Sequence, residues 1–158
     1  MTVSVESAGA HTHARNVMKI LLAVDGSDRS TAALDLLVEH VSWFREAPSI
    51  ALIHVHPPIP YAGAAARAGR EAVQRYYAEE SEKVLEPAKA RLATKGIQAE
   101  AIALVGEPAD EIARYAAQHG KDLIAMGTHG RTGLSNLVLG SVATKVLAQS
   151  KVPVLLLR

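Results

Sequence analysis

Short apolar segments alternate with longer amphipathic segments along this chain, and this alternation restricts the fold more than any other feature. The apolar segments are too short for helices and are rich in valine, isoleucine and leucine: residues 19–24, 49–56, 98–105, 122–126 and 152–157. Continuous apolar runs of this kind are typical of strands in a parallel sheet that helices cover on both faces. The sequence therefore predicts a five-stranded parallel sheet.

The segments between these runs carry apolar residues at helical spacing. They comprise residues 27–44, 71–95, 108–120 and 141–149. Pro87 lies inside the second segment and should kink or divide that helix, and Gly96 is placed to end it. Residues 57–70 are rich in proline, alanine and glycine and are expected to form a loop. Strands and helices in alternation indicate one α/β domain of the doubly wound type.

Length and composition exclude several kinds of protein. A chain of 158 residues suits one domain. Because the chain has no cysteine, disulfides, thiolate catalysis and cysteine-ligated metal centres are excluded. The net charge is +1 and the basic residues are dispersed, so we expect no nucleic-acid partner. No apolar run reaches the ~20 residues of a membrane-spanning helix, so we expect no membrane partner.

The first 17 residues differ from the rest of the chain. They are polar and lack the apolar stretch of a signal peptide, so we expect a flexible tail over residues 1–17, a domain over 18–158 and a cytoplasmic protein. His11 and His13 form a His-x-His pair in this tail. Without a nearby carboxylate cluster, this pair is more typical of solvated side chains than of a metal site.

Glycines follow the fourth predicted strand in a pattern that suits an anion. Gly127 and Gly130 come first, and after nine further residues Gly140 and Ser141 open the next predicted helix. Glycine lets the main chain approach a ligand closely, because it has no Cβ. The helix would direct free N–H groups and its positive end at the bound group. The pattern therefore predicts a phosphate site here.

The carboxyl ends of other strands bring further residues toward this loop. Ligands of doubly wound sheets bind at this edge, where the strand order reverses. Asp25 follows the first strand and Val55 and His56 end the second. If the first and fourth strands are neighbours, Asp25 faces the glycine loop. A phosphate-binding loop opposite a carboxylate is the outline of a nucleotide site.

His54 and His56 lie two residues apart and share one strand face. No third metal ligand is evident beside them, so we expect no metal site there.

The glycine spacing differs from two well-known phosphate motifs. It is not the G-x-G-x-x-G of dinucleotide-binding folds, and no lysine precedes Ser141 as in a P-loop. From spacing alone, an ordinary tight turn at Gly127 and Gly130 is an equal alternative.

Three segments resemble the universal stress protein family. The glycines match the signature G-x2-G-x9-G-[ST] of its ATP-binding branch. The opening Ile20-Leu-Leu-Ala-Val-Asp-Gly-Ser27, the stretch from Asp122 to Arg131 and the ending Lys151-Val-Pro-Val-Leu-Leu-Leu157 are similar to the corresponding family segments. The resemblance covers roughly residues 17–158.

The resemblance implies a Rossmann-like sheet, similar to the adenine nucleotide alpha hydrolases, with strand order 3-2-1-4-5. It also implies a homodimer through the last strand, Val152–Leu157. An apolar edge strand aggregates unless it is paired or covered, so pairing with a second copy is physically reasonable. The alternative is an edge that the chain's own helices cover.

The resemblance also implies roles for individual residues. The backbone of Gly130, Gly140, Ser141 and Val142 would hold the triphosphate, and Gly127 would pass close to the ribose. Asp25 would contact the nucleotide through a ribose hydroxyl or a divalent ion, Val55 would meet the adenine edge, and Met126 would lie at the lip of the fourth strand. His129 and Arg131 are placed to reach phosphate oxygens.

Each of these residues also has a purely structural interpretation. Asp25 is equally suited to an Asx turn before the helix, and Ser141 to an N-cap. Val55 and Met126 are also suited to the core, and His129 and Arg131 to an ordinary surface loop.

Taken together, the residues and the resemblance imply an ATP-binding regulatory or sensor protein of the stress response. It would bind ATP with Mg²⁺ or Mn²⁺ and act on a protein partner that the sequence does not identify. The alternative is a slow metal-dependent ATPase or a nucleotide-dependent transferase. Hydrolysis at more than a weak rate is not expected, because the chain offers neither a P-loop lysine nor an evident arginine finger.

Overall fold

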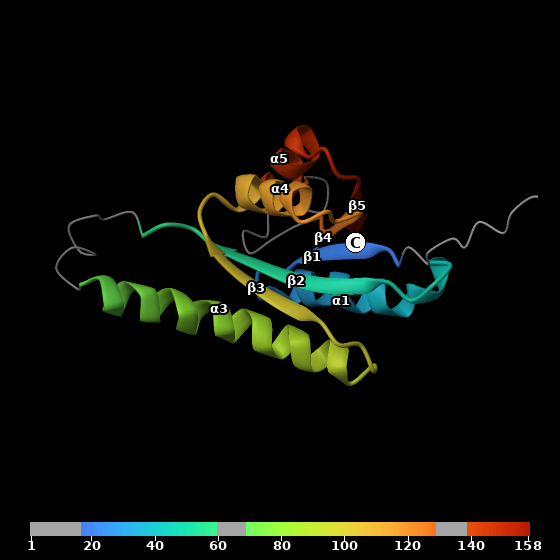
Figure 1. The fold of residues 1–158 in the computed structure, drawn as a ribbon, viewed down its shortest axis with the longest axis horizontal. Coiled ribbons are helices and arrows are strands. Elements are labelled where there is room, and N and C mark those ends of the chain that lie inside the picture. The colour runs from blue at the N-terminus through green and yellow to red at the C-terminus, as the bar shows by residue number, and fades with distance from the viewer. Residues whose placement is uncertain (1–16, 60–68, 129–138) are drawn as a thin grey trace, which may run out of the picture.

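One parallel sheet organises the molecule (Figure 1). The computed structural model describes residues 17–59, 69–128 and 139–158. Within these ranges the strands are β1 (Lys19–Ala23), β2 (Ser49–His56), β3 (Glu100–Val105), β4 (Leu123–Gly127) and β5 (Val154–Leu157). They form a sheet in the order β3-β2-β1-β4-β5, and each neighbouring pair is parallel. The predicted fold class and strand order are confirmed.

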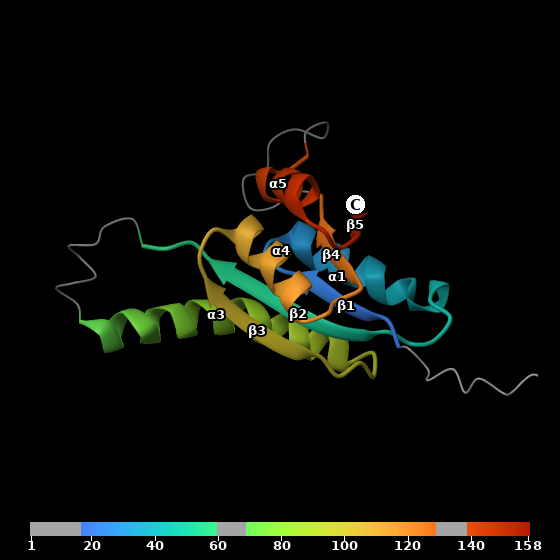
Figure 2. The ribbon, with the colours of Figure 1, turned by 45° about the horizontal axis from the view of Figure 1, so that its top comes forward.

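Helices cover both faces of the sheet. The first face carries α1 (Asp28–Glu39) and α3 (Arg70–Ala93), and the second carries α4 (Pro108–Gln118) and α5 (Ser141–Gln149). Figures 1 and 2 show α4 and α5 together on one side of the sheet and α3 on the other. The chain thus changes face between β3 and β4, as a doubly wound topology requires.

The central strand β1 is buried on both faces. Leu22 packs with Leu52 and Leu85 in a core on the α1 and α3 face, whereas Leu21 packs with Ile53 and Val146 on the α4 and α5 face. Successive side chains of a strand point to opposite faces, so a strand between two helical layers must be apolar throughout. This explains the continuous apolar runs of the sequence.

The first helix is shorter than predicted. It ends at Glu39 rather than Phe44, and a single turn of 3-10 helix, η1 (Val41–Trp43), follows. His40 is the C-cap residue of α1: its backbone N–H still bonds to the Leu36 carbonyl, but its φ of −107° and ψ of 16° lie outside the helical range. The apolar periodicity continues beyond this residue and therefore overestimated the length of the helix.

Pro87 does not divide the third helix, which runs without interruption from Arg70 to Ala93. Proline removes one helical hydrogen bond. The buried side chains of Val84 and Leu85 precede it and that of Leu92 follows it in the same core. Packing on both sides of the proline offsets the lost bond, so the predicted division is wrong.

The last strand begins at Val154 rather than Val152. Ser150 folds the chain locally before it, since its hydroxyl donates to the Val152 carbonyl and accepts from the Val152 N–H. The predicted tail, with His11 and His13, lies outside the described residues.

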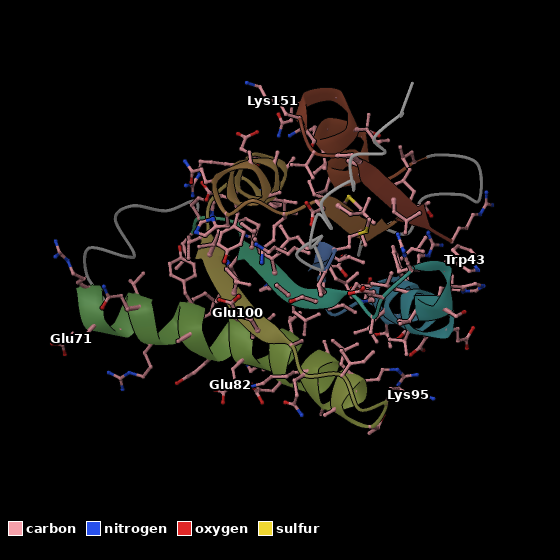
Figure 3. The ribbon with its side chains drawn as sticks, turned by 45° about the vertical axis from the view of Figure 1, so that its right-hand side comes forward. Trp43, Glu71, Glu82, Lys95, Glu100 and Lys151 are labelled. Atoms are coloured by element: carbon pink, nitrogen blue, oxygen red, sulfur yellow. The ribbon has the colours of Figure 1, made fainter. Side chains whose placement is uncertain are left out.

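Charged side chains lie on the outside of both helical layers, as Figure 3 shows for Glu71 and Glu82 on α3, for Lys95 just beyond the end of α3 and for Lys151. None of the helices in the described ranges has the length and apolarity that crossing a bilayer requires.

Replacing Leu22 should test the burial of β1 on the α1 and α3 face. Leu22 is 0% exposed, so Leu22→Ala leaves a cavity in the core and should lower the free energy of unfolding by about 2–5 kcal/mol. Leu147→Ala makes the same change at a residue that is 44% exposed and should change it by less than about 0.5 kcal/mol. Urea denaturation measures both values, and equal losses would contradict this description of the core.

An ion pair between α1 and α3 should make stability depend on pH. Arg91 donates to Asp35 through Nε (2.5 Å) and Nη2 (2.6 Å), and these hydrogen bonds lower the pKa of Asp35 below its usual value. A lowered folded-state pKa stabilises the protein above the unfolded pKa of about 3.9, and the stabilisation disappears as the pH falls through the folded-state pKa.

The measurement is the difference in melting temperature between wild type and Asp35→Asn. It should be constant near neutral pH and decrease below about pH 4. It should also decrease in high salt, because both side chains are partly exposed. A difference independent of pH and salt would show that the pair does not contribute as a charge interaction.

Candidate nucleotide site

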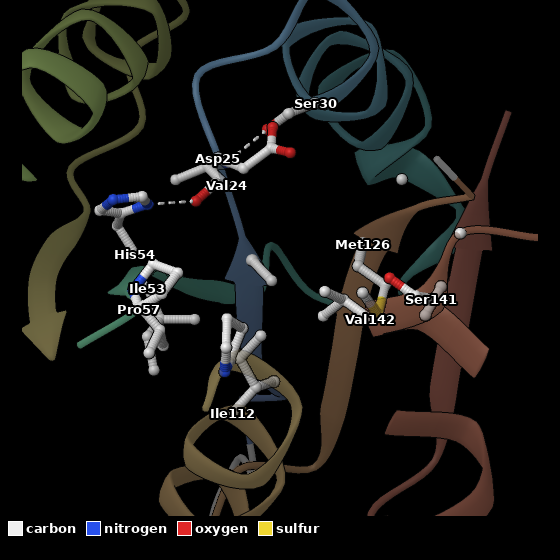
Figure 4. A pocket seen from close by; sticks show the side chains of 16 residues that line it. Val24, Asp25, Ser30, Ile53, His54, Pro57, Ile112, Met126, Ser141 and Val142 are labelled. Carbon is white, nitrogen blue, oxygen red and sulfur yellow. Dashed lines mark hydrogen bonds between the residues drawn. The ribbon is translucent and has the colours of Figure 1, made fainter. Parts of the chain in front are cut away.

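A cavity of about 320 Å³ opens at the carboxyl edge of the sheet, between the ends of β1, β2 and β4. Its walls are mainly apolar, and Figure 4 shows Ile53, Pro57 and Ile112 opposite Met126 and Val142. The remaining lining residues are Ala23, Val24, Asp25, Ser30, His54, Val55, Pro108, Gly127, Gly140, Ser141 and Ala143. A mainly apolar cavity with a few polar groups is the usual form of a small-molecule site.

Asp25 follows β1 and shapes the turn into α1. Its Oδ1 accepts hydrogen bonds from the Ser27 N–H (3.0 Å) and from the Ser27 hydroxyl (2.6 Å), which is an Asx turn. Gly26 completes the turn at φ +78°, a conformation that favours glycine. The structural interpretation of Asp25 is thus correct, and the same residue also lines the cavity.

The first turn of α1 continues this arrangement. The Ser27 hydroxyl caps the helix by accepting from the Ser30 N–H, and the buried Ser30 hydroxyl accepts from the Asp25 N–H at 3.1 Å. These bonds hold the carboxylate of Asp25 and the start of α1 in one arrangement beside the cavity.

The start of α5 forms the facing wall. Gly140 is its N-cap residue and Ser141 its first helical residue, so Ser141 is not the N-cap. The Gly140 N–H donates to the Thr128 carbonyl at 2.7 Å and is therefore engaged in this structure. The first backbone hydrogen bond of α5 runs from Thr144 to Gly140, so the N–H groups of Ser141, Val142 and Ala143 precede it. These donors lie at the positive end of α5.

The end of β2 presents backbone groups to the cavity. The Ile53 carbonyl accepts from the Val24 N–H, so it points toward β1. Backbone groups two residues apart in a strand point the same way, hence the N–H and C=O of Val55 also point toward β1. Because β1 ends at Ala23, they face the space where the two strands separate.

His54, next to Val55, is buried with 6% of its surface exposed. Its ring Nδ1 lies 2.9 Å from the Val24 carbonyl oxygen, as the dashed line in Figure 4 marks. The sequence indicated His54 only as one of two histidines on a strand face without a third metal ligand, and it did not identify Ser30, Pro57, Pro108 or Ile112 as site residues.

The cavity brings together most of the residues predicted for the site. Asp25, Val55, Met126, Gly127, Gly140, Ser141 and Val142 line it. The neighbouring strands β1 and β4 carry Asp25 and Gly127 to the same edge, as the predicted strand order requires. His129, Gly130 and Arg131 lie outside the described residues.

The electrostatics of the described walls come from few groups. Asp25 is the one carboxylate among them, and none of them is a lysine or an arginine. The starts of α1, α4 and α5 all contribute to the lining, through Ser30, Pro108 and Ser141. Each helix start adds a partial positive charge, so the cavity favours an anion near α5. Within the described ranges, no three His, Asp or Glu side chains form a metal-binding cluster.

Comparison with known proteins agrees with this geometry. The model of the universal stress protein family matches residues 16–158. The universal stress protein YxiE of Bacillus subtilis is 38% identical in an alignment of 160 positions. The alignment covers 89% of this chain and 98% of YxiE.

Solved structures show the same fold. Protein MJ0577 of Methanocaldococcus jannaschii superposes with a TM-score of 0.73 at 30% identity, over 89% of this chain and 94% of that one. A universal stress protein from Archaeoglobus fulgidus, solved in complex with dAMP, superposes with a TM-score of 0.63 at 25% identity, over 89% of this chain and 98% of that one. The chain belongs to the universal stress protein family.

Proposed function

We propose that this protein binds ATP, with Mg²⁺ or Mn²⁺, and acts as a nucleotide-dependent regulatory protein of the stress response. The observation that carries the proposal is the cavity itself, in which the Val55 backbone and the first N–H groups of α5 line the same space. The dAMP complex of the Archaeoglobus fulgidus relative supports an adenine nucleotide as the ligand.

In this proposal the apolar walls hold the adenine ring. Ile53 and Ile112 offer the surfaces on which a flat base packs, and Val55 offers an N–H donor and a C=O acceptor. The adenine edge carries the complementary pair, the acceptor N1 and the donor 6-amino group. A donor and an acceptor side by side orient the base as well as bind it.

The phosphates then lie toward α5. The N–H groups of Ser141, Val142 and Ala143 donate to phosphate oxygens, and the helix dipole adds to the attraction. Asp25 binds a ribose hydroxyl or the divalent cation that the triphosphate carries. His129, Gly130 and Arg131 belong to the chain segment that joins Thr128 to Leu139. Gly130 stays part of the proposed site on the family signature, and His129 and Arg131 because they flank it and carry side chains that suit phosphate oxygens.

The first experiment is to identify the nucleotide that the purified protein releases, before and after incubation with Mg·ATP, by mass spectrometry. We expect about one ATP per chain. ADP that accumulates with time would favour the alternative, a slow ATPase or a nucleotide-dependent transferase. Absence of any bound nucleotide, together with no measurable affinity by calorimetry, would overturn the proposal.

Asp25→Asn should separate the two roles of Asp25. The amide oxygen still accepts from Ser27 in the turn, but the negative charge is lost. We expect Mg·ATP affinity to fall about tenfold, or about 1.4 kcal/mol, with little change in melting temperature. The control is Asp28→Asn in the first turn of α1, outside the cavity lining. Equal affinities of the two variants in calorimetry would exclude a ligand role for Asp25.

The dimer implied by the family also stays a proposal, and β5 suggests how to test it. Pro153 and Leu157 direct their carbonyls toward β4. Because alternate residues face opposite ways, the backbone groups of Val154 and Leu156 point away from β4, to the outer edge. A second copy can pair with this edge about a two-fold axis.

Leu156→Pro should therefore disrupt the dimer. Proline removes the outward N–H of residue 156 while the hydrogen bonds between β4 and β5 involve other residues. In sedimentation velocity we expect wild type to be a dimer and the variant a monomer, with a comparable circular dichroism spectrum. If wild type is a monomer, or the variant a dimer, pairing through β5 is excluded.

A further inference from the structure

The hydrogen-bond ladder between β1 and β2 stops one rung early, beside the cavity. The last rung runs from the Val24 N–H to the Ile53 carbonyl, at 2.9 Å. In this register the next rung would run from the Val55 N–H to the Val24 carbonyl. The described residues show no such bond. The Val24 carbonyl is instead within hydrogen-bond distance of the His54 ring.

The direction of the bond to His54 is determined by its acceptor. A carbonyl oxygen only accepts, so Nδ1 of His54 carries the proton and donates to Val24. His54 follows Leu52 on the α1 and α3 face of the sheet, whereas Ile53 and Val55 point their side chains to the other face. The donor therefore approaches the Val24 carbonyl from the α1 and α3 side, and not from within the sheet.

In this arrangement the backbone N–H and C=O of Val55 face the cavity. A buried N–H without a partner is costly, so a neighbouring acceptor would normally take it. The nearest one in the register is the Val24 carbonyl, which His54 occupies. A carbonyl oxygen can accept two hydrogen bonds, so the competition between His54 and Val55 is one of direction: His54 orients the Val24 carbonyl toward the α1 and α3 face, and in this structure Val55 makes no bond to it.

We propose that His54 is a positioning residue, which holds the Val24 carbonyl away from Val55 and so keeps the Val55 N–H and C=O available to an adenine edge. This inference rests on the proposed function for its ligand. It makes His54 a determinant of base selectivity without any contact to the base. Guanine presents a donor at N1 and an acceptor at position 6, the reverse of adenine, and does not match the Val55 pair.

Two substitutions of His54 test the proposal. His54→Leu removes the donor, so the Val24 carbonyl becomes free to accept from Val55 and the ladder extends by one rung. His54→Asn keeps an N–H donor near the position of Nδ1 and should retain the wild-type arrangement. The control is His56→Leu, two residues along β2, whose ring Nδ1 contacts the Pro57 carbonyl instead.

The first readout is amide hydrogen exchange by NMR without nucleotide. In His54→Leu we expect the Val55 amide to exchange at least about tenfold more slowly than in wild type, because it gains a hydrogen bond. The Ile53 amide should be unchanged. In His54→Asn and His56→Leu the Val55 amide should exchange as in wild type. A general loss of stability would speed exchange throughout and cannot produce this pattern.

The second readout is the ratio of ATP to GTP affinity, measured by calorimetry. We expect His54→Leu to lower ATP affinity at least about tenfold while GTP affinity changes little, and His54→Asn to restore the ratio. Unchanged Val55 exchange in His54→Leu would overturn the inference, whatever the affinities. Slowed Val55 exchange in a protein that binds no nucleotide would refute the proposed function and leave the competition between His54 and Val55 established.

Discussion

The rest of the structure depends on the different directions that the chain takes after β1 and after β4. These two strands are neighbours and parallel, but the helices that follow them lie on opposite faces of the sheet. Beyond Ala23 the chain must turn toward α1, and beyond Gly127 it leads toward α5. The cavity lies at this edge, between the end of β1 and the end of β4, where ligands of doubly wound sheets bind.

The same topology determines the electrostatics of the cavity. Every parallel strand ends at this edge, and the helix that follows it begins there, so α1, α4 and α5 bring their positive ends to one place. The described walls therefore attract an anion without a lysine or an arginine. A triphosphate carries more negative charge than helix ends balance, which is a physical reason to expect a divalent cation beside Asp25.

Much of this fold was predictable because the relevant signals are local. Apolar runs gave the five strands to within about two residues at most ends, and the resemblance supplied the strand order. The errors have local causes too. α1 ends where the backbone of His40 leaves the helical conformation, and packing around Pro87 maintains α3. Apolar periodicity records neither of these features.

The site was predictable only in part. Asp25, Gly140 and Ser141 stand in recognisable turn and loop patterns, and the cavity includes all three. The role of His54 depends on strand register, because a shift of one residue between β1 and β2 would move its ring away from Val24. Such information exists only once the strands are paired. Pro108 and Ile112 lie on a helix that was predicted, but their place at the cavity depends on how α4 packs over the sheet, which the local sequence does not indicate.

Structural and ligand-binding roles in this cavity support each other rather than exclude each other. Asp25 holds its turn, His54 holds the Val24 carbonyl, and Gly140 bonds to Thr128 across the glycine-bearing segment. Each bond places a neighbouring group that the proposed ligand would use: a carboxylate, a backbone pair or a helix start. Binding to groups already held in place loses less conformational entropy than binding to mobile ones. Replacing a residue that only holds such a group, as His54 holds the Val24 carbonyl, should therefore weaken binding even though it makes no contact with the nucleotide.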